Sequence, residues 1–164
     1  MPTPSLALDH FAYPAHDVAE THRFYTSFLG LPLVAAWSGV SPEWGDRAYV
    51  MMVFGLKGGG QIVFFGLEGL AARPQRDGLP KDIRHVAMTA SSAKDLDAWK
   101  RKLRMHRISY WEEDHDVQKS VYFADPNGLT LEITHPASAL AITTERGAKK
   151  VVDDWVKGAP ARRR

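Results

Sequence analysis

The chain has 164 residues, 45% of them hydrophobic and 24% charged, and a formal net charge of +2 at pH 7. These values are typical of a soluble globular protein and do not suggest a basic surface for a nucleic acid. No apolar run approaches the ~20 residues of a membrane span, and the N-terminus lacks the pattern of a secretory signal. Cysteine is absent, which excludes disulfides and thiolate metal ligands. We therefore expect a cytoplasmic protein with no nucleic-acid or membrane partner.

The first part of the chain predicts a strand, a helix and three further strands. Asp17 is a typical helix N-cap, and Gly30 and Pro32 are typical of a helix end. A Gly/Pro/Ser-rich stretch at 38–46 predicts a loop. The expected helix covers 18–29, and the expected strands cover 6–13, 33–37, 49–56 and 61–67.

The second part predicts the same order again after a linker at 68–82. The expected helix covers 92–104, and the expected strands cover 83–89, 108–112, 120–124 and 129–134. One more helix, at 144–157, lies outside the repeat. The predicted organisation is therefore a first module at 1–67, the linker, a second module at 83–136, and a C-terminal helical extension with a basic tail at 137–164.

The two modules align with each other, so the chain carries an internal repeat. In this alignment His10 falls on His85, and Gln61 falls on Glu132. Each module has the order βαβββ, which predicts an α+β fold in which two tandem modules form a curved mixed sheet around a cleft. Two histidines and a carboxylate at equivalent places suggest one metal site between the halves.

Residues 6–136 resemble the vicinal oxygen chelate superfamily, which includes glyoxalase I, type I extradiol dioxygenases, fosfomycin-resistance enzymes and bleomycin-binding proteins. The resemblance depends on the stretch 21–31 and on 122–128, together with His10, His85 and Glu132. The stretch 21–31 is common to the superfamily and indicates the fold alone. The three further residues resemble the metal-ligand set of its active enzymes.

Two imidazoles and one carboxylate leave coordination positions open, an arrangement that suits Fe(II) oxygenases. Ni, Zn, Mn and Co also accept such ligands. Gln61 is a fourth candidate, at a place where glyoxalase I usually has a glutamate ligand. An amide oxygen can bind a metal but cannot act as a general base. Whether Gln61 binds the metal or contacts the substrate is open at this point.

The last strands resemble the signature of type I extradiol dioxygenases, which runs here from His115 through Tyr122 and 125–128 to Glu132. By this resemblance His115 and Tyr122 provide acid/base catalysis and hydrogen bonds to the substrate. Glu113 departs from the signature, where a small or apolar residue is usual. The alternative is that His115 is an inert, solvated loop histidine. The predicted strand 61–67 also lacks a histidine that extradiol enzymes usually have.

The first functional hypothesis is an Fe(II) extradiol-type dioxygenase acting on a catechol-like aromatic. The alternative is a glyoxalase I-like lyase or isomerase that uses Ni or Zn, and a remoter one is a small-molecule or antibiotic-binding resistance protein. The superfamily resemblance also implies a homodimer. Aromatic residues that belong either to the core or to a substrate cleft are Trp37, Trp44, Tyr49, Phe54, Phe64 and Trp111.

Overall fold

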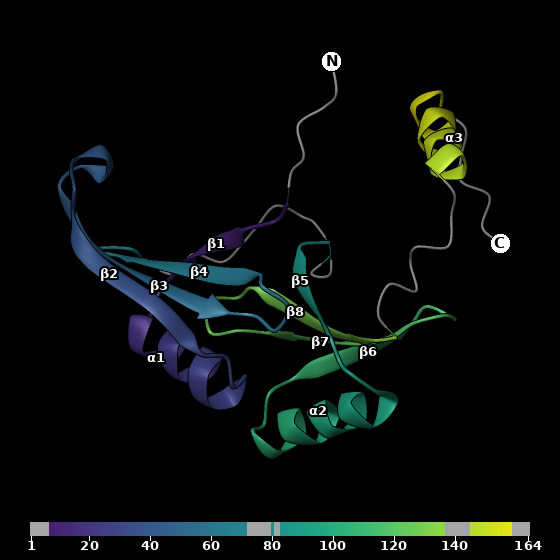
Figure 1. The fold of residues 1–164 in the computed structure, drawn as a ribbon, viewed down its shortest axis with the longest axis horizontal. Coiled ribbons are helices and arrows are strands. Elements are labelled where there is room, and N and C mark those ends of the chain that lie inside the picture. The colour runs from purple at the N-terminus through teal and green to yellow at the C-terminus, as the bar shows by residue number, and fades with distance from the viewer. Residues whose placement is uncertain (1–6, 72–79, 81–82, 137–144, 159–164) are drawn as a thin grey trace. The chain divides into compact units, whose positions relative to one another are not determined.

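A computed structural model describes residues 7–71, 80, 83–136 and 145–158. Each half contains a helix and a four-stranded mixed sheet, with strand orders β1-β4-β3-β2 and β5-β8-β7-β6 (Figure 1). The predicted α+β class with two βαβββ modules and a C-terminal helix is confirmed. Most of the expected linker and the basic tail lie outside the described residues, so the predicted module boundaries stay a prediction.

The first module contains a parallel pair, β1 with β4, extended by antiparallel pairing of β4 with β3 and of β3 with β2. The expectation of a loop at 38–46 was wrong for its first part, because residues 38–41 continue β2 by pairing with β3. Backbone pairing here outweighs the weak strand propensity of glycine and serine. The bounds are β1 His10–Ala15, β2 Leu33–Ser41, β3 Arg47–Gly55 and β4 Gln61–Leu67.

The expected helix at 18–29 is divided into two parts. Helix α1, Val18–Arg23, begins after Asp17, whose carboxylate accepts a hydrogen bond from the N–H of Glu20. A wider π-helical turn, η1, Phe24–Phe28, follows, and Leu29 N–H donates to the carbonyl of Phe24. A short 3₁₀ turn, η2, Pro42–Trp44, lies between β2 and β3.

The core of the first module lies between this helical segment and one face of its sheet. The rings of Tyr25, Phe54 and Phe64 are fully buried, and the centroid of the Tyr25 ring lies 5.2 Å from that of Phe54 and 4.6 Å from that of Phe64. Phe54 and Phe64 are therefore core residues. The open alternative that they line a cleft does not hold.

Gly66 lies on β4 directly against α1. A Cβ at this position would come within 2.2 Å of Val18 Cγ2, so the helix must shift to accommodate it. We expect Gly66→Ala to lower the free energy of unfolding by about 1–3 kcal/mol, the usual cost of overpacking. Urea unfolding measures this loss. Gly60→Ala is the control, since the nearest atom to its new Cβ is 3.6 Å away. An equal loss in both variants would contradict the steric explanation.

The second module has an apolar and a polar face on its central strands. Val121 and Phe123 of β7 and Leu131 and Ile133 of β8 are buried, whereas the alternate residues of both strands are mostly polar. Ser92 caps α2 by accepting a hydrogen bond from the N–H of Asp95. The bounds are β5 His85–Thr89, α2 Ala93–Met105, β6 Tyr110–Asp114, β7 Lys119–Ala124 and β8 Thr130–His135.

Helix α3, Glu145–Val156, exposes Val151, Val152, Trp155 and Val156. None of the helices in the described ranges is long and apolar enough to cross a membrane.

The chain divides into two compact units, Met1–Val86 with Ala124–Leu131, and Ala87–Phe123 with Glu132–Arg164. The turn that precedes β8 belongs to the first unit because it is hydrogen-bonded to the helical segment. Tyr25 O–H donates to Asp125 Oδ2 at 3.1 Å, and the backbone N–H of His16 donates to Asn127 Oδ1 at 2.9 Å. These bonds anchor a polar turn to a buried core residue.

Candidate functional site

His10 and Gln61 lie next to each other in the first sheet. They are register partners on the parallel strands β1 and β4, so their side chains project from the same face. The core ring of Phe64 lies an odd number of positions from Gln61 on β4 and therefore faces the other side. The structure thus brings two of the predicted ligand candidates together on the face that lies opposite to α1.

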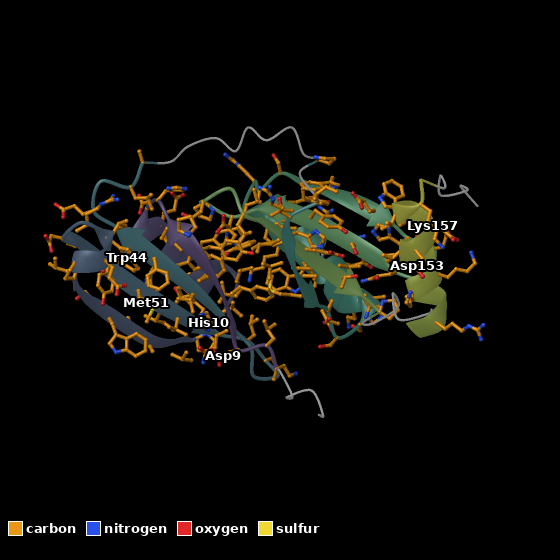
Figure 2. The ribbon with its side chains drawn as sticks, turned by 90° about the horizontal axis from the view of Figure 1, so that it is seen from above. Asp9, His10, Trp44, Met51, Asp153 and Lys157 are labelled. Atoms are coloured by element: carbon orange, nitrogen blue, oxygen red, sulfur yellow. The ribbon has the colours of Figure 1, made fainter. Side chains whose placement is uncertain are left out.

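His10 has a partner that suits a metal-binding histidine. Its Nδ1 lies 2.6 Å from Asp9 Oδ2, and both side chains are visible in Figure 2. A carboxylate that accepts from Nδ1–H fixes the tautomer and leaves Nε2 free to bind a metal. Gln61 would add a neutral amide oxygen beside it. The nitrogen and oxygen donors present here fit a divalent metal of the Mn to Zn series.

Glu132 is a buried carboxylate on the polar face of β8. Only 5% of the residue is exposed, and its Oε1 accepts a hydrogen bond from the hydroxyl of Ser120 on β7. A buried carboxylate is costly unless other groups compensate its charge. The Tyr122 hydroxyl is a second hydrogen-bonding neighbour of this carboxylate. A buried carboxylate of this kind is a suitable ligand for a divalent cation.

His115 and Tyr122 lie together in the second module. His115 Nε2 is 3.5 Å from the Tyr122 hydroxyl and 3.4 Å from Glu113 Oε2. Trp111 stacks on Tyr122 with ring centroids 5.2 Å apart, and its Nε1–H donates to Glu113 Oε1 at 3.1 Å. His115 is therefore held by a carboxylate and a phenol and is not an isolated loop side chain.

Tyr122 remains a neutral phenol at physiological pH. Burial, together with the nearby carboxylate of Glu132, raises the pKa of Tyr122 to about 12. A protonated phenol can donate a hydrogen bond to a developing oxyanion. Tyr122 is thus a neighbour of both His115 and Glu132. All three residues belong to the second unit.

The predicted ligand set as a whole remains a prediction. His85 begins β5, which lies next to β8 in the second sheet. Val86 is buried, and because side chains alternate along a strand, the side chain of His85 lies on the other face of β5 from that of Val86. Within the described residues, no group of three or more histidine and acidic side chains is gathered closely enough to hold a metal ion. The structure therefore brings together His10 with Gln61, and His115 with Tyr122 and Glu132.

Sequence reasoning missed the roles of Ser120 and Glu113. For Ser120 the available signal was strand periodicity, since Ser120 and Tyr122 are two residues apart on β7 and so share a face. Glu113 was noted only as a departure from the extradiol signature. Its position two residues before His115 was the available signal, and its carboxylate is a partner of that histidine.

Comparisons with solved structures show similarity over most of the chain. The trypanothione-dependent glyoxalase I of Leishmania major is 18% identical with a TM-score of 0.64, covering 95% of this chain and 100% of that one. A glyoxylase/bleomycin resistance protein/dioxygenase domain from Frankia is 20% identical with a TM-score of 0.62, covering 80% and 98%. The fosfomycin resistance protein FosX of Listeria monocytogenes, complexed with Mn(II) and sulfate, is 14% identical with a TM-score of 0.60, covering 84% and 98%.

At these identities the solved structures establish the fold alone. None of the curated proteins compared with the chain is similar enough to count as a match. The model of one protein family, however, matches residues 7–133, which span both modules and every candidate residue described above. The chain therefore belongs to the Glyoxalase/Bleomycin resistance protein/Dioxygenase superfamily.

Proposed function

We propose that the protein is a metal-dependent lyase or isomerase of glyoxalase type that acts on a small molecule with two neighbouring oxygens. His10, His85 and Glu132 are the proposed metal ligands, with Gln61 as a fourth. The observation that carries the proposal is the cluster of His115 and Tyr122 beside Glu132. This cluster supplies the proton-transfer group that Gln61, being an amide, does not provide.

When bound, the divalent metal would polarise the two substrate oxygens as a Lewis acid. His115 takes a proton from the substrate carbon at Nε2 and returns it to the neighbouring carbon. Glu113 stabilises the imidazolium that forms, since its Oε2 lies 3.4 Å from that nitrogen. Tyr122 donates a hydrogen bond to the substrate oxygen on which negative charge develops. Trp111 holds the phenol ring in place by stacking.

Substitution of His115 tests this assignment. We expect His115→Ala to lower kcat by about 10²–10⁴-fold, the usual contribution of a positioned acid/base group, with metal affinity unchanged. Steady-state kinetics and metal titration measure the two effects. His22→Ala, an exposed histidine on α1, is the matched control. Unchanged kcat in His115→Ala would show that the histidine takes no part in proton transfer.

The reaction type can be tested without knowledge of the natural substrate. Protein loaded with Ni(II), Zn(II) or Mn(II) is incubated in D₂O with a panel of α-hydroxycarbonyl compounds, and NMR follows exchange at the carbon that bears the hydroxyl. Metal-dependent exchange that is lost in His115→Ala is the expected result. Absence of exchange across the panel with every metal would argue against the lyase or isomerase proposal.

A second candidate is the Fe(II) extradiol-type dioxygenase. One observation favours it: His115 and Tyr122 lie 3.5 Å apart, as the ring-cleavage signature implies for an acid/base group beside a substrate-binding phenol. O₂ uptake on a panel of catechols after loading with Fe(II), with a yellow ring-opened product, would establish this reaction. Uptake that requires iron would replace the first proposal, and a lack of uptake with every catechol would exclude the second.

The face of the first sheet that carries His10 and Gln61 also carries aromatic side chains, which favour a substrate with an apolar group. Trp44 contacts Tyr49 and Phe65, with ring centroids 5.2 and 5.6 Å apart. Phe65 is four residues after Gln61 on β4, so it shares the face of His10. Figure 2 shows Trp44, Met51 and His10 along this sheet. We infer that the substrate has an apolar group of planar shape in addition to its chelating oxygens.

The homodimer implied by the superfamily resemblance is part of the proposal. Trp155 and Val156 of α3 are 71% and 78% exposed in the single chain, and apolar exposure of this kind suits an interface. Sedimentation of the full chain tests the assembly.

A further inference from the structure

The second unit contains a cavity that lies apart from the residues of the proposed metal site. Its volume is about 460 Å³, within the range of small-molecule sites. It is bordered by the first turns of α2, the segment leading into β7 and the end of β8. The lining residues that matter here are Asp97, Lys100, Asp116, Gln118, Lys119 and His135.

Gln118 has a buried acceptor that borders this cavity. The residue is only 5% exposed, and its Nε2–H donates to the Thr134 hydroxyl. Its Oε1 is buried and has no hydrogen-bond partner among the residues that the structure describes. Buried amide oxygens are rarely left unpaired, because desolvation without a partner is costly. Gln118 Oε1 is therefore an acceptor that a ligand with a hydrogen-bond donor can satisfy.

His135 provides a second acceptor at the cavity. Its Nδ1 lies 3.1 Å from the carbonyl oxygen of Ala90. A carbonyl can only accept, so Nδ1 carries the hydrogen and Nε2 of the neutral ring is an acceptor.

The charges around the cavity favour a cation. Lys100 Nζ lies 2.7 Å from Glu112 and 3.6 Å from Asp97, and Lys119 Nζ lies 3.2 Å from Asp114. Both lysines are thus engaged by carboxylates. Glu112 and Asp114 lie outside the cavity lining but pair with its two lysines, which leaves the negative charge of the lining carboxylates Asp97 and Asp116 in excess. A ligand that carries N–H donors and a positive charge satisfies both the acceptors and this excess.

A chain of hydrogen bonds connects Gln118 to Glu132. Ser120 has one hydroxyl hydrogen, which goes to the Glu132 carboxylate because that bond is charge-assisted. Since Ser120 has no second hydrogen, the 2.9 Å contact between the Ser120 and Thr134 hydroxyls requires Thr134 to donate, in preference to its longer 3.3 Å contact with the carbonyl of Lys119. Thr134 in turn accepts from Gln118 Nε2. Every link donates toward Glu132, and such chains strengthen their members cooperatively.

We propose that this cavity is a second ligand site, for a small molecule with a protonated primary amine. One ammonium N–H donates to Gln118 Oε1, and the positive charge faces Asp97 and Asp116. The bound amine adds a donor at the far end of the chain and so strengthens the bond that Ser120 donates to Glu132. Binding does not depend on the proposed metal chemistry. Only an effect on metal affinity rests on Glu132 being a ligand.

Propylammonium chloride is the probe, titrated into the metal-free full chain. NMR follows the side-chain amide of Gln118 for binding and the carboxylate carbon of Glu132 for the chain. We expect saturable shifts of both signals with a dissociation constant of about 1–10 mM. Tetramethylammonium chloride is the matched control, since it carries the same charge without an N–H donor. It should produce no saturable shift.

Two variants test the roles of Gln118 and Asp116 in binding. The backbone NMR spectrum of each variant shows whether it is folded. Gln118→Met, close in size but without the acceptor, should weaken propylammonium binding about 10-fold as read from the backbone signals that line the cavity. Asp116→Asn should weaken it about 3-fold, and Asp154→Asn on α3 should leave it unchanged.

Equal responses to both ammonium ions, or undiminished binding by Gln118→Met, would overturn the site. A Gln118 shift without a Glu132 shift would overturn the link between them. All of these titrations use metal-free protein, so their outcomes can be interpreted even if the proposed metal site is wrong.

Discussion

Glu132→Gln is expected to weaken metal binding by more than about 100-fold and to abolish metal-dependent turnover. Glu132 is the one carboxylate among the proposed ligands, so the substitution removes the only negative charge in that set. Loss of an outer-shell partner alone typically costs 10–100-fold in metal affinity, and loss of a ligand should exceed it. Titration with Mn(II), in competition with a chelator, measures the affinity.

The metal-free form should keep its stability in this variant. A neutral amide can still accept the hydrogen bond from Ser120, and it is less costly to bury than a carboxylate. Ser120→Ala should weaken metal binding about 10–100-fold, since it removes a partner and keeps the ligand. Glu43→Gln, on the exposed turn η2, is the control. Unchanged affinity in Glu132→Gln would show that the ligand set is wrong.

Much of the fold could be predicted because the repeat and the hydrophobic periodicity are strong signals. Strand β4 agrees at both ends with the prediction, and the order of elements in both modules is as expected. The errors arise where tertiary pairing overrides local propensity. Ser41 pairs with Arg47 and so extends β2 into a stretch with loop-like composition. The π-helical turn at η1 has no marker in the sequence.

The candidate site could be predicted only in part. A motif names His115 and Tyr122, and in the structure His115 Nε2 lies 3.5 Å from the Tyr122 hydroxyl. No motif predicts that Glu113 reaches the same imidazole, because that contact depends on the backbone path at the end of β6. The hydrogen bond from Ser120 to Glu132 depends on the pairing of two strands, which one sequence does not specify.

Asp125→Ala is expected to lower the free energy of unfolding by about 3 kcal/mol. The carboxylate of Asp125 accepts hydrogen bonds from the backbone N–H groups of Asn127 and Leu129, each at 2.8 Å. It also accepts from the side chains of Tyr25 and Asn127, at 3.1 and 3.0 Å. Hydrogen bonds to a charged group contribute about 1.5–3 kcal/mol each, and they are not additive. Alanine leaves several buried donors without a partner.

Urea unfolding measures this loss, and tyrosine variants separate its parts. Tyr25→Phe removes one donor and should cost about 1–2 kcal/mol. Tyr13→Phe is the matched control, since it removes a hydroxyl from a tyrosine whose ring contacts the same core residue, Phe64. Equal losses in the two tyrosine variants would show that the bond to Asp125 contributes nothing specific.

The same carboxyl group should make stability depend on pH. Burial raises the pKa of Asp125 in the folded protein, although its hydrogen bonds act in the opposite direction. The folded state therefore binds this proton more tightly than the unfolded chain, whose aspartates titrate near about 3.9. The resulting stabilisation is fully present below that value and is lost as the pH rises through the folded pKa. The unfolding free energy of the wild type minus that of Asp125→Asn should thus fall as the pH rises above about 4. A difference that rises over this range would show that the hydrogen bonds outweigh burial.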